Sequence, residues 1–76
     1  MIFYLETERS KELGYRYEVR TGGGMTTVNV QRVREVNLPY VGWEDVDCFT
    51  LAENVTPEQA MEHIREWERE GEEEED

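Results

Sequence analysis

Carboxylates are the side chains of this 76-residue chain that are most able to do chemistry, since 19 Asp and Glu stand against 8 Lys and Arg. Two carboxylates that face each other across a cleft can serve as general acid and general base. Carboxylates at fixed spacing around a glycine turn bind calcium, as in the EF-hand loop. That spacing is absent here, and a chain this short leaves little concave room for a cleft. We therefore expect neither a carboxylate-based enzyme nor an organised metal site.

The chain has one cysteine and one histidine as its other reactive side chains. Cys48 is the only cysteine and His63 the only histidine, so neither an internal disulfide nor a Cys/His zinc site can form. The pattern supplies no third group to orient His63 as a base for Cys48. The glycine run 22–24 lacks the Lys and Ser/Thr that follow a phosphate-binding loop, and it indicates a turn. The sequence thus predicts no catalytic residue and no cofactor.

Some of the carboxylates are regularly spaced. Four glutamates at four-residue intervals would form one row on a helix, which we call the acidic ridge: Glu58, Glu62, Glu66 and Glu70. Neighbours in this row would lie about 6 Å apart along the axis, and like charges at this spacing destabilise a helix. Arg65 and Arg69 could offset part of this by pairing with Glu62 and Glu66. A second group, the acidic patch, comprises Glu44, Asp45 and Asp47.

A helix is strongly predicted at the ridge. Thr56, Pro57 and Gln59 supply an N-cap, a favourable first residue and the third position of a capping box. An apolar stripe then recurs at helical spacing: Ala60, Met61, Ile64 and Trp67. Gly71 is a plausible C-terminal stop. The spacing predicts a helix over 57–70.

The rest of the chain has the character of β-structure. Strands are predicted over 2–8, 14–20, 25–33 and 46–52, with connections over 9–13 and 37–43. In the second strand, Tyr15, Tyr17 and Val19 should face the core while Arg16, Glu18 and Arg20 face outward. The third strand slips in phase, which predicts a bulge near Gln31 or Arg32. The expected fold class is α+β: a three- or four-stranded antiparallel meander with one C-terminal helix packed on a face.

The domain organisation follows from length. Residues 1–70 are expected to form a single domain, and the polyacidic tail 71–76 is expected to be disordered. A core of this size supplies only about 3–5 kcal/mol, so a homodimer or a bound partner would be a natural source of further stability. The first residues and the hydropathy pattern lead us to expect neither a leader sequence nor a membrane-spanning stretch, and the lone cysteine suits a reducing compartment. The expected location is the cytoplasm, that of a host cell if the chain is phage-encoded.

Charge is unevenly distributed along the chain. Residues 1–34 contain six basic and four acidic groups, whereas residues 35–76 contain fifteen acidic groups and two arginines. The overall net charge of −11 disfavours direct binding to nucleic acid or to an anionic membrane. Tyr15 and Tyr17 could form a stacking platform for bases, but they should project away from the arginines of their strand.

A short, strongly acidic chain with a compact α+β core and no catalytic constellation resembles small phage-encoded inhibitors. That group includes anti-restriction and anti-CRISPR proteins, several of which mimic DNA. The resemblance is one of type and rests on composition, with no shared motif and no residue to carry over. It implies that carboxylates take the place of phosphates in the Arg/Lys groove of a nucleic-acid-binding complex.

Our hypothesis is a non-catalytic inhibitor that binds a basic surface of a protein or nucleoprotein complex. The residues expected to contact the partner are the acidic ridge and the acidic patch. One alternative is a small assembly domain that self-associates through a sheet edge or through Tyr40 and Trp43, with acidity serving solubility. Another is an antitoxin-like partner of one basic protein.

Overall fold

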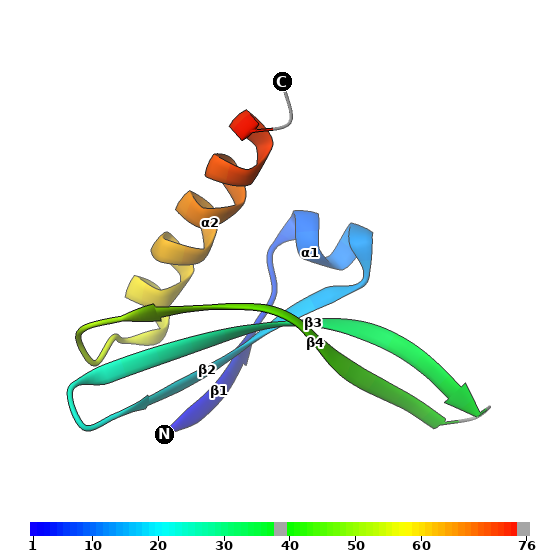
Figure 1. Ribbon diagram of the computed structural model, residues 1–76, viewed down its shortest axis with the longest axis horizontal. Coiled ribbons are helices and arrows are strands. Elements are labelled where there is room, and N and C mark those ends of the chain that lie inside the picture. Colours follow the sequence, from blue (N-terminus) through cyan, green and yellow to red (C-terminus); the bar gives the residue numbers. More distant parts are fainter. Residues whose placement is uncertain (38–39, 75–76) are drawn as a thin grey trace.

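The computed structural model describes residues 1–37 and 40–74, within which four strands and two helices form (Figure 1). In chain order these are β1 (Ile2–Leu5), α1 (Glu8–Leu13), β2 (Tyr15–Gly22), β3 (Met25–Asn37), β4 (Tyr40–Leu51) and α2 (Pro57–Glu74).

The strands form one antiparallel sheet in the order β1-β2-β3-β4, which is a meander. The ladder between β2 and β3 stops at the pair Tyr15↔Arg32, whereas the ladder between β3 and β4 continues to Asn37↔Tyr40. The β3–β4 hairpin therefore extends beyond β1 and β2 as a two-stranded arm (Figure 1). The predicted α+β class, with an antiparallel sheet and a C-terminal helix on one face, is confirmed.

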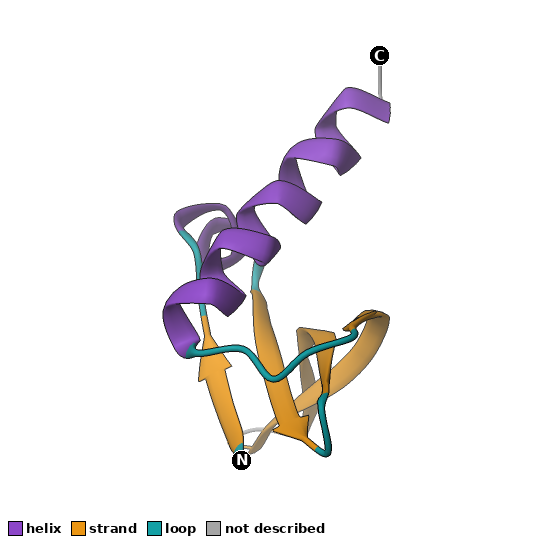
Figure 2. Cartoon of the chain, turned by 90° about the vertical axis from the view of Figure 1, so that its left-hand side faces the viewer, coloured by secondary structure: helices purple, strands orange, loops and turns teal. Residues whose placement is uncertain are grey.

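The core lies between α2 and one face of the sheet, and the helix crosses the strands obliquely (Figure 2). Tyr17 and Val19 of β2 are buried and Arg20 is exposed, as the alternation predicts. The buried apolar residues are Tyr17, Val19, Val28, Val30, Val55, Ala60 and Ile64. Because this cluster is small, each of its members contributes a large share of the stability of the domain.

The predicted start of α2 is confirmed by a reciprocal capping box. The Gln59 amide N–H donates to Thr56 Oγ1 at 3.2 Å, and the Thr56 amide N–H donates to Gln59 Oε1 at 3.0 Å. The predicted end at Gly71 is wrong, since α2 runs to Glu74 and Gly71 does not adopt positive φ. The helix continues for four residues beyond residue 70, because the packed apolar stripe of the preceding turns already stabilises it. The predicted tail 71–76 overlaps this last turn, and residues 75–76 lie outside the described part.

Two other local predictions are wrong. The segment 9–13, expected to be a connection, belongs to α1, which Thr7 caps at its start and Gly14 ends at φ 78°. Six residues are too few to show an apolar stripe, so only these end signals mark the helix. Tyr40–Trp43, expected within a loop because of Pro39 and Gly42, begins β4, and residues 38–39 lie outside the described part.

The bulge is found close to its predicted position but on the partner strand. Val30 pairs with Asp47 while Gln31 pairs with Asp45, which leaves Val46 of β4 as the extra residue. The phase slip in β3 therefore indicates where the ladder is interrupted, but not which strand contains the extra residue.

Candidate functional site

The acidic ridge lies on α2, and all four of its side chains are exposed. Among residues 1–34 and 42–71, whose side chains the structure describes, Arg20 pairs with Glu18 and His63 lies 3.9 Å from Glu53, and no ion pair within 4.0 Å involves the ridge. The expected pairs of Glu62 with Arg65 and of Glu66 with Arg69 are not formed at that distance. The last turn of α2 also contains no basic residue to complement the helix dipole. The ridge carboxylates are therefore uncompensated within the described part of the chain.

The acidic ridge runs obliquely over α2, because rows of residues four apart are inclined to a helix axis. At its C-terminal end, Glu66 and Glu70 line a groove of about 260 Å³ between α2 and β4, which we call the α2–β4 groove. The other side chains that line this groove are Phe49, Leu51, His63 and Trp67. Glu58 and Glu62 lie outside it, so only half of the ridge borders apolar side chains.

The acidic patch is not one surface. Glu44 pairs with Arg32 and Asp45 with Gln31 in the ladder, and neighbouring residues of a strand point to opposite faces. Asp45 Oδ1 accepts a hydrogen bond of 3.0 Å from Gln31 Nε2. The structure therefore does not bring the patch together with the ridge as a single contact area.

Asp47 instead has a role at the edge of the sheet. Its Oδ1 accepts the backbone N–H of Cys48 at 2.8 Å, and β4 is an edge strand. Exposed N–H groups on an edge strand can pair with another chain, and charged side chains and bulges prevent this. The carboxylate of Asp47 and the bulge at Val46 both protect the β4 edge in this way.

A carboxylate that we did not single out from the sequence fixes the far end of α2. Glu68 Oε2 accepts hydrogen bonds from Thr7 Oγ1 at 2.8 Å and from the Tyr17 hydroxyl at 2.7 Å. Arg9 Nη1 donates to the Glu68 backbone carbonyl at 2.9 Å. Burial, together with the hydrogen bond to Glu68, raises the pKa of the Tyr17 hydroxyl. Glu68 thus ties α2 to both α1 and β2.

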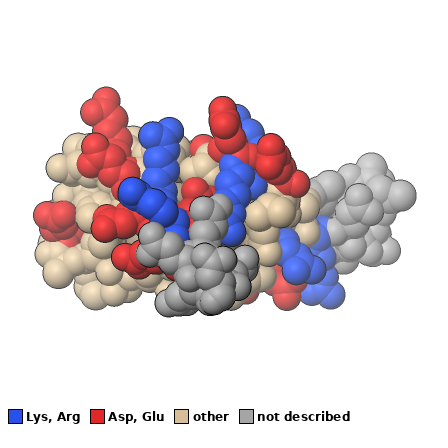
Figure 3. Space-filling view, turned by 90° about the horizontal axis from the view of Figure 1, so that it is seen from above, with Lys and Arg blue, Asp and Glu red and all other residues tan. Residues whose placement is uncertain are grey.

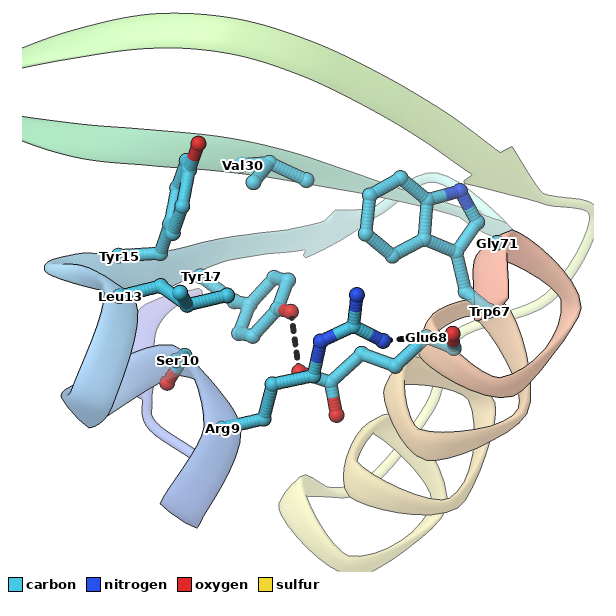
Figure 4. A pocket seen from close by; sticks show the side chains of 9 residues that line it. All are labelled: Arg9, Ser10, Leu13, Tyr15, Tyr17, Val30, Trp67, Glu68 and Gly71. Carbon is cyan, nitrogen blue, oxygen red and sulfur yellow. Dashed lines mark hydrogen bonds between the residues drawn. The ribbon is translucent and has the colours of Figure 1, made fainter. Parts of the chain in front are cut away.

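Beside Glu68 lies a cavity of about 310 Å³ between α1, the sheet and α2 (Figure 4). Tyr15 and Trp67 stand on opposite sides of it, and Leu13 and Val30 contribute further apolar surface. Every buried side-chain polar atom among the described residues already has a hydrogen-bond partner. No unpaired buried group is left to recognise a ligand, so we interpret the cavity as space left where α2 diverges from the sheet.

The open face of the sheet contains a polar network centred on Glu18, which is only 7% exposed although α2 covers the opposite face. Glu18 accepts hydrogen bonds from Arg20 Nε at 2.6 Å, Gln31 Nε2 at 3.3 Å, and the Tyr4 hydroxyl and Asn29 Nδ2 at 3.4 Å. The hydrogen bond from Arg20 holds the pKa of the Glu18 carboxyl below its ordinary value, assisted by the amides of Asn29 and Gln31. Sequence alternation placed Glu18 on this face but did not reveal its burial.

Arg16 connects this network to two aromatic rings. Its Nε donates to Gln31 Oε1 at 2.7 Å, and its guanidinium carbon lies 4.3 Å from the Tyr4 ring centroid and 4.1 Å from that of Trp43. Cation–π contacts at this range hold all three side chains in place. Trp43, expected to contact a second copy of the chain, is 39% exposed and already contacts Arg16. The side chain of Tyr40 lies outside the described part.

The lowered pKa of Glu18 predicts a specific acid sensitivity. A carboxyl whose pKa is lower in the folded state contributes stability above its unfolded pKa of about 4.3, and this is lost as pH falls through the folded pKa. We expect Glu18→Gln to be less stable than wild type at pH 7, with the difference shrinking below about pH 4. Urea midpoints of both proteins between about pH 3 and pH 7 measure this. A difference that stays constant over this range would contradict the assigned role.

On one face of the molecule, acidic and basic side chains lie next to one another. The view from above shows Lys and Arg side chains standing between groups of Asp and Glu (Figure 3). On the face seen in this view, the charge contrast between the two halves of the sequence therefore does not become separate acidic and basic areas. The unpaired ridge, rather than the net charge of a whole face, is the distinctive electrostatic feature of α2.

Comparisons of the chain with protein-family models, with characterised proteins and with solved structures find no match. Within residues 1–37 and 40–74, no group of three or more His, Cys, Asp or Glu side chains is arranged to hold a metal ion. In the same part of the chain, no helix has both the length and the apolar composition needed to cross a bilayer.

Proposed function

We propose that this chain is a non-catalytic binding protein whose acidic ridge occupies a basic surface of another protein or nucleoprotein complex. The observation that supports this most directly is the lack of any ion pair at Glu58, Glu62, Glu66 and Glu70 among the described residues. A surface that ordinarily binds nucleic acid is the expected target, since it presents the Lys and Arg side chains that these carboxylates would match.

The electrostatics of α2 favour such a partner. Like charges four residues apart repel by about 0.2–0.5 kcal/mol per pair. The carboxylates of the C-terminal half also lie near the negative end of the helix dipole, and no basic residue offsets them in the last turn. A partner that places cations over the ridge would relieve both effects.

The fixed position of α2 favours a binding role for the ridge carboxylates over a role in solubility alone. Carboxylates that only solubilise a protein need no fixed positions, whereas the ridge stands on a helix that is capped at its start and anchored by Glu68 near its end. Positions fixed in advance reduce the entropy lost on binding. Inhibition would follow from competition, because a partner surface covered by the ridge cannot bind nucleic acid at the same time.

A second candidate function is self-association through the open face of the sheet. The exposed apolar side chains on that face favour it: Ile2, Tyr4, Val33 and Trp43. We prefer the ridge because its carboxylates have no partners in the described part of the chain, whereas the Tyr4 and Trp43 rings are already engaged by Arg16.

Charge reversal tests the proposed function. Replacing all four ridge glutamates by Lys should lower the capture of basic, nucleic-acid-binding proteins from a host lysate by at least about tenfold. The captured proteins should elute from the wild-type chain with rising salt, and added DNA should compete for them.

The matched control reverses four other exposed glutamates: Glu6, Glu8, Glu12 and Glu53. Both variants then have the same net charge, and only the position of the change differs. Equal loss of capture by the two variants would show that net charge is responsible and that the ridge is not the contact surface.

A further inference from the structure

The α2–β4 groove has an apolar floor. Phe49 and Trp67 stack with their ring centroids 5.7 Å apart and their planes 18° from parallel, and Leu51 lies beside them. All three side chains are only partly buried, although they pack against the core. A partly exposed apolar floor of this kind gains free energy when another apolar side chain covers it.

The rim of the groove is negative. Glu66 and Glu70 line it on the α2 side and have no ion pair among the described residues. His63, also in the lining, lies 3.9 Å from the carboxylate of Glu53. An apolar floor with an uncompensated acidic rim is complementary to an apolar side chain flanked by Lys or Arg.

The edge of β4 disfavours an added strand as the occupant. Asp47 already accepts the N–H of Cys48, and the bulge at Val46 interrupts the ladder nearby. An extended segment that paired with β4 would have to displace the Asp47 carboxylate. A helix contacts such a groove through side chains alone and needs no free backbone groups on β4.

We infer that the α2–β4 groove receives an apolar side chain from a basic amphipathic helix of the partner protein, whose cations contact Glu66 and Glu70. The inference depends on the proposed function and makes it more specific. A surface that binds the ridge by charge alone needs no apolar residue, whereas the groove requires one between its basic residues.

Two peptides test the inference directly. One is an amphipathic Leu/Lys helix of about 16 residues, and the other has the same charge with Gln in place of each Leu. At about 300 mM NaCl, where screening weakens the charge attraction, the Leu/Lys peptide should bind at least about tenfold more tightly, as measured by fluorescence anisotropy.

Paired variants locate the binding site. Glu66→Gln with Glu70→Gln should weaken binding of the Leu/Lys peptide by about tenfold. Glu58→Gln with Glu62→Gln removes the same charge outside the groove and should weaken it by less than about threefold. Equal losses in the two double variants would overturn the placement in the groove.

Leu51→Gln should abolish the advantage of the Leu/Lys peptide over the Gln/Lys peptide. Leu13→Gln, which makes the same change in the cavity on the other side of α2, should leave that advantage intact. If Leu51→Gln does not fold, chemical-shift changes in the wild-type chain decide: shifts at Phe49, Leu51 and Trp67 support the groove. Shifts confined to another face overturn it.

The two proposals fail in different ways. Equal affinity for both peptides at high salt would overturn the groove inference and leave the acidic ridge as a charge-based contact. Absence of binding by either peptide at about 50 mM NaCl, where attraction between charges is strong, would overturn both proposals.

Discussion

Ile64→Ala is expected to leave a large fraction of the protein unfolded at 25 °C. Ile64 is fully buried and belongs to the small cluster between α2 and the sheet. Removing an Ile side chain from a core costs about 2–5 kcal/mol, and a core of this size supplies about 3–5 kcal/mol in total. Urea titration followed by circular dichroism measures the loss.

Leu13→Ala is the matched control for this substitution, since it also truncates an aliphatic side chain within a helix. Leu13 is 57% exposed, and we expect its loss to change the free energy of unfolding by less than about 1 kcal/mol. Similar destabilisation by the two substitutions would mean that the cluster around Ile64 is not the principal core.

The start of α2 was predictable because all of its signals are local. Thr56, Pro57 and Gln59 lie within one turn, and a capping box depends on that turn alone. The end was not predictable from Gly71, since glycine permits a helix to stop but does not require it. Whether a helix continues depends on how well the preceding turns are packed.

The sheet was predictable in outline and less so in detail. Alternation identified the inward face of β2, and the glycine turn identified the β2–β3 hairpin. The length of β4 was not visible, because Gly42 normally weakens a strand and here pairs with Arg34 in the arm. Pairing over such a distance depends on the partner strand, which a local pattern does not show.

Candidate contact residues were predictable only where helical spacing placed them together. The acidic ridge follows from its four-residue interval. The acidic patch was grouped by closeness in sequence, and the β ladder separates its members between the two faces of the sheet. Glu18 and Glu68 were not singled out, because their partners Tyr4, Gln31 and Tyr17 come from other elements.

The carboxylates of this chain therefore fall into two groups with different physical roles. Glu18, Asp45, Asp47 and Glu68 accept hydrogen bonds that hold the open face, the β4 edge and the end of α2. The acidic ridge accepts none from the described residues, so repulsion between its carboxylates dominates their energetics in this chain. The number of acidic residues alone therefore does not indicate function. The proposal that the ridge binds a basic surface rests on the difference between carboxylates with and without hydrogen-bond partners.

Glu68→Ala is expected to destabilise the fold by about 2–4 kcal/mol, although the residue is only partly buried. The substitution removes a charged acceptor from two buried donors, the hydroxyls of Thr7 and Tyr17. Each hydrogen bond to a charged group contributes about 1.5–3 kcal/mol, and a buried donor left without a partner is costly. Urea titration measures the total effect.

The spectroscopic consequence is as specific as the energetic one. With Glu68 removed, the Tyr17 hydroxyl loses the hydrogen bond that, after burial, helps to raise its pKa, so the titration of Tyr17 itself should move to lower pH. Glu62→Ala, on the exposed side of the same helix, removes an equal charge without any hydrogen bond among the described residues and should change stability by no more than about 0.5 kcal/mol. Equally small effects of both substitutions would mean that the hydrogen bonds of Glu68 to Thr7 and Tyr17 do not fix the C-terminal half of α2. The proposal that Glu66 and Glu70 are held in fixed positions would then lose its support.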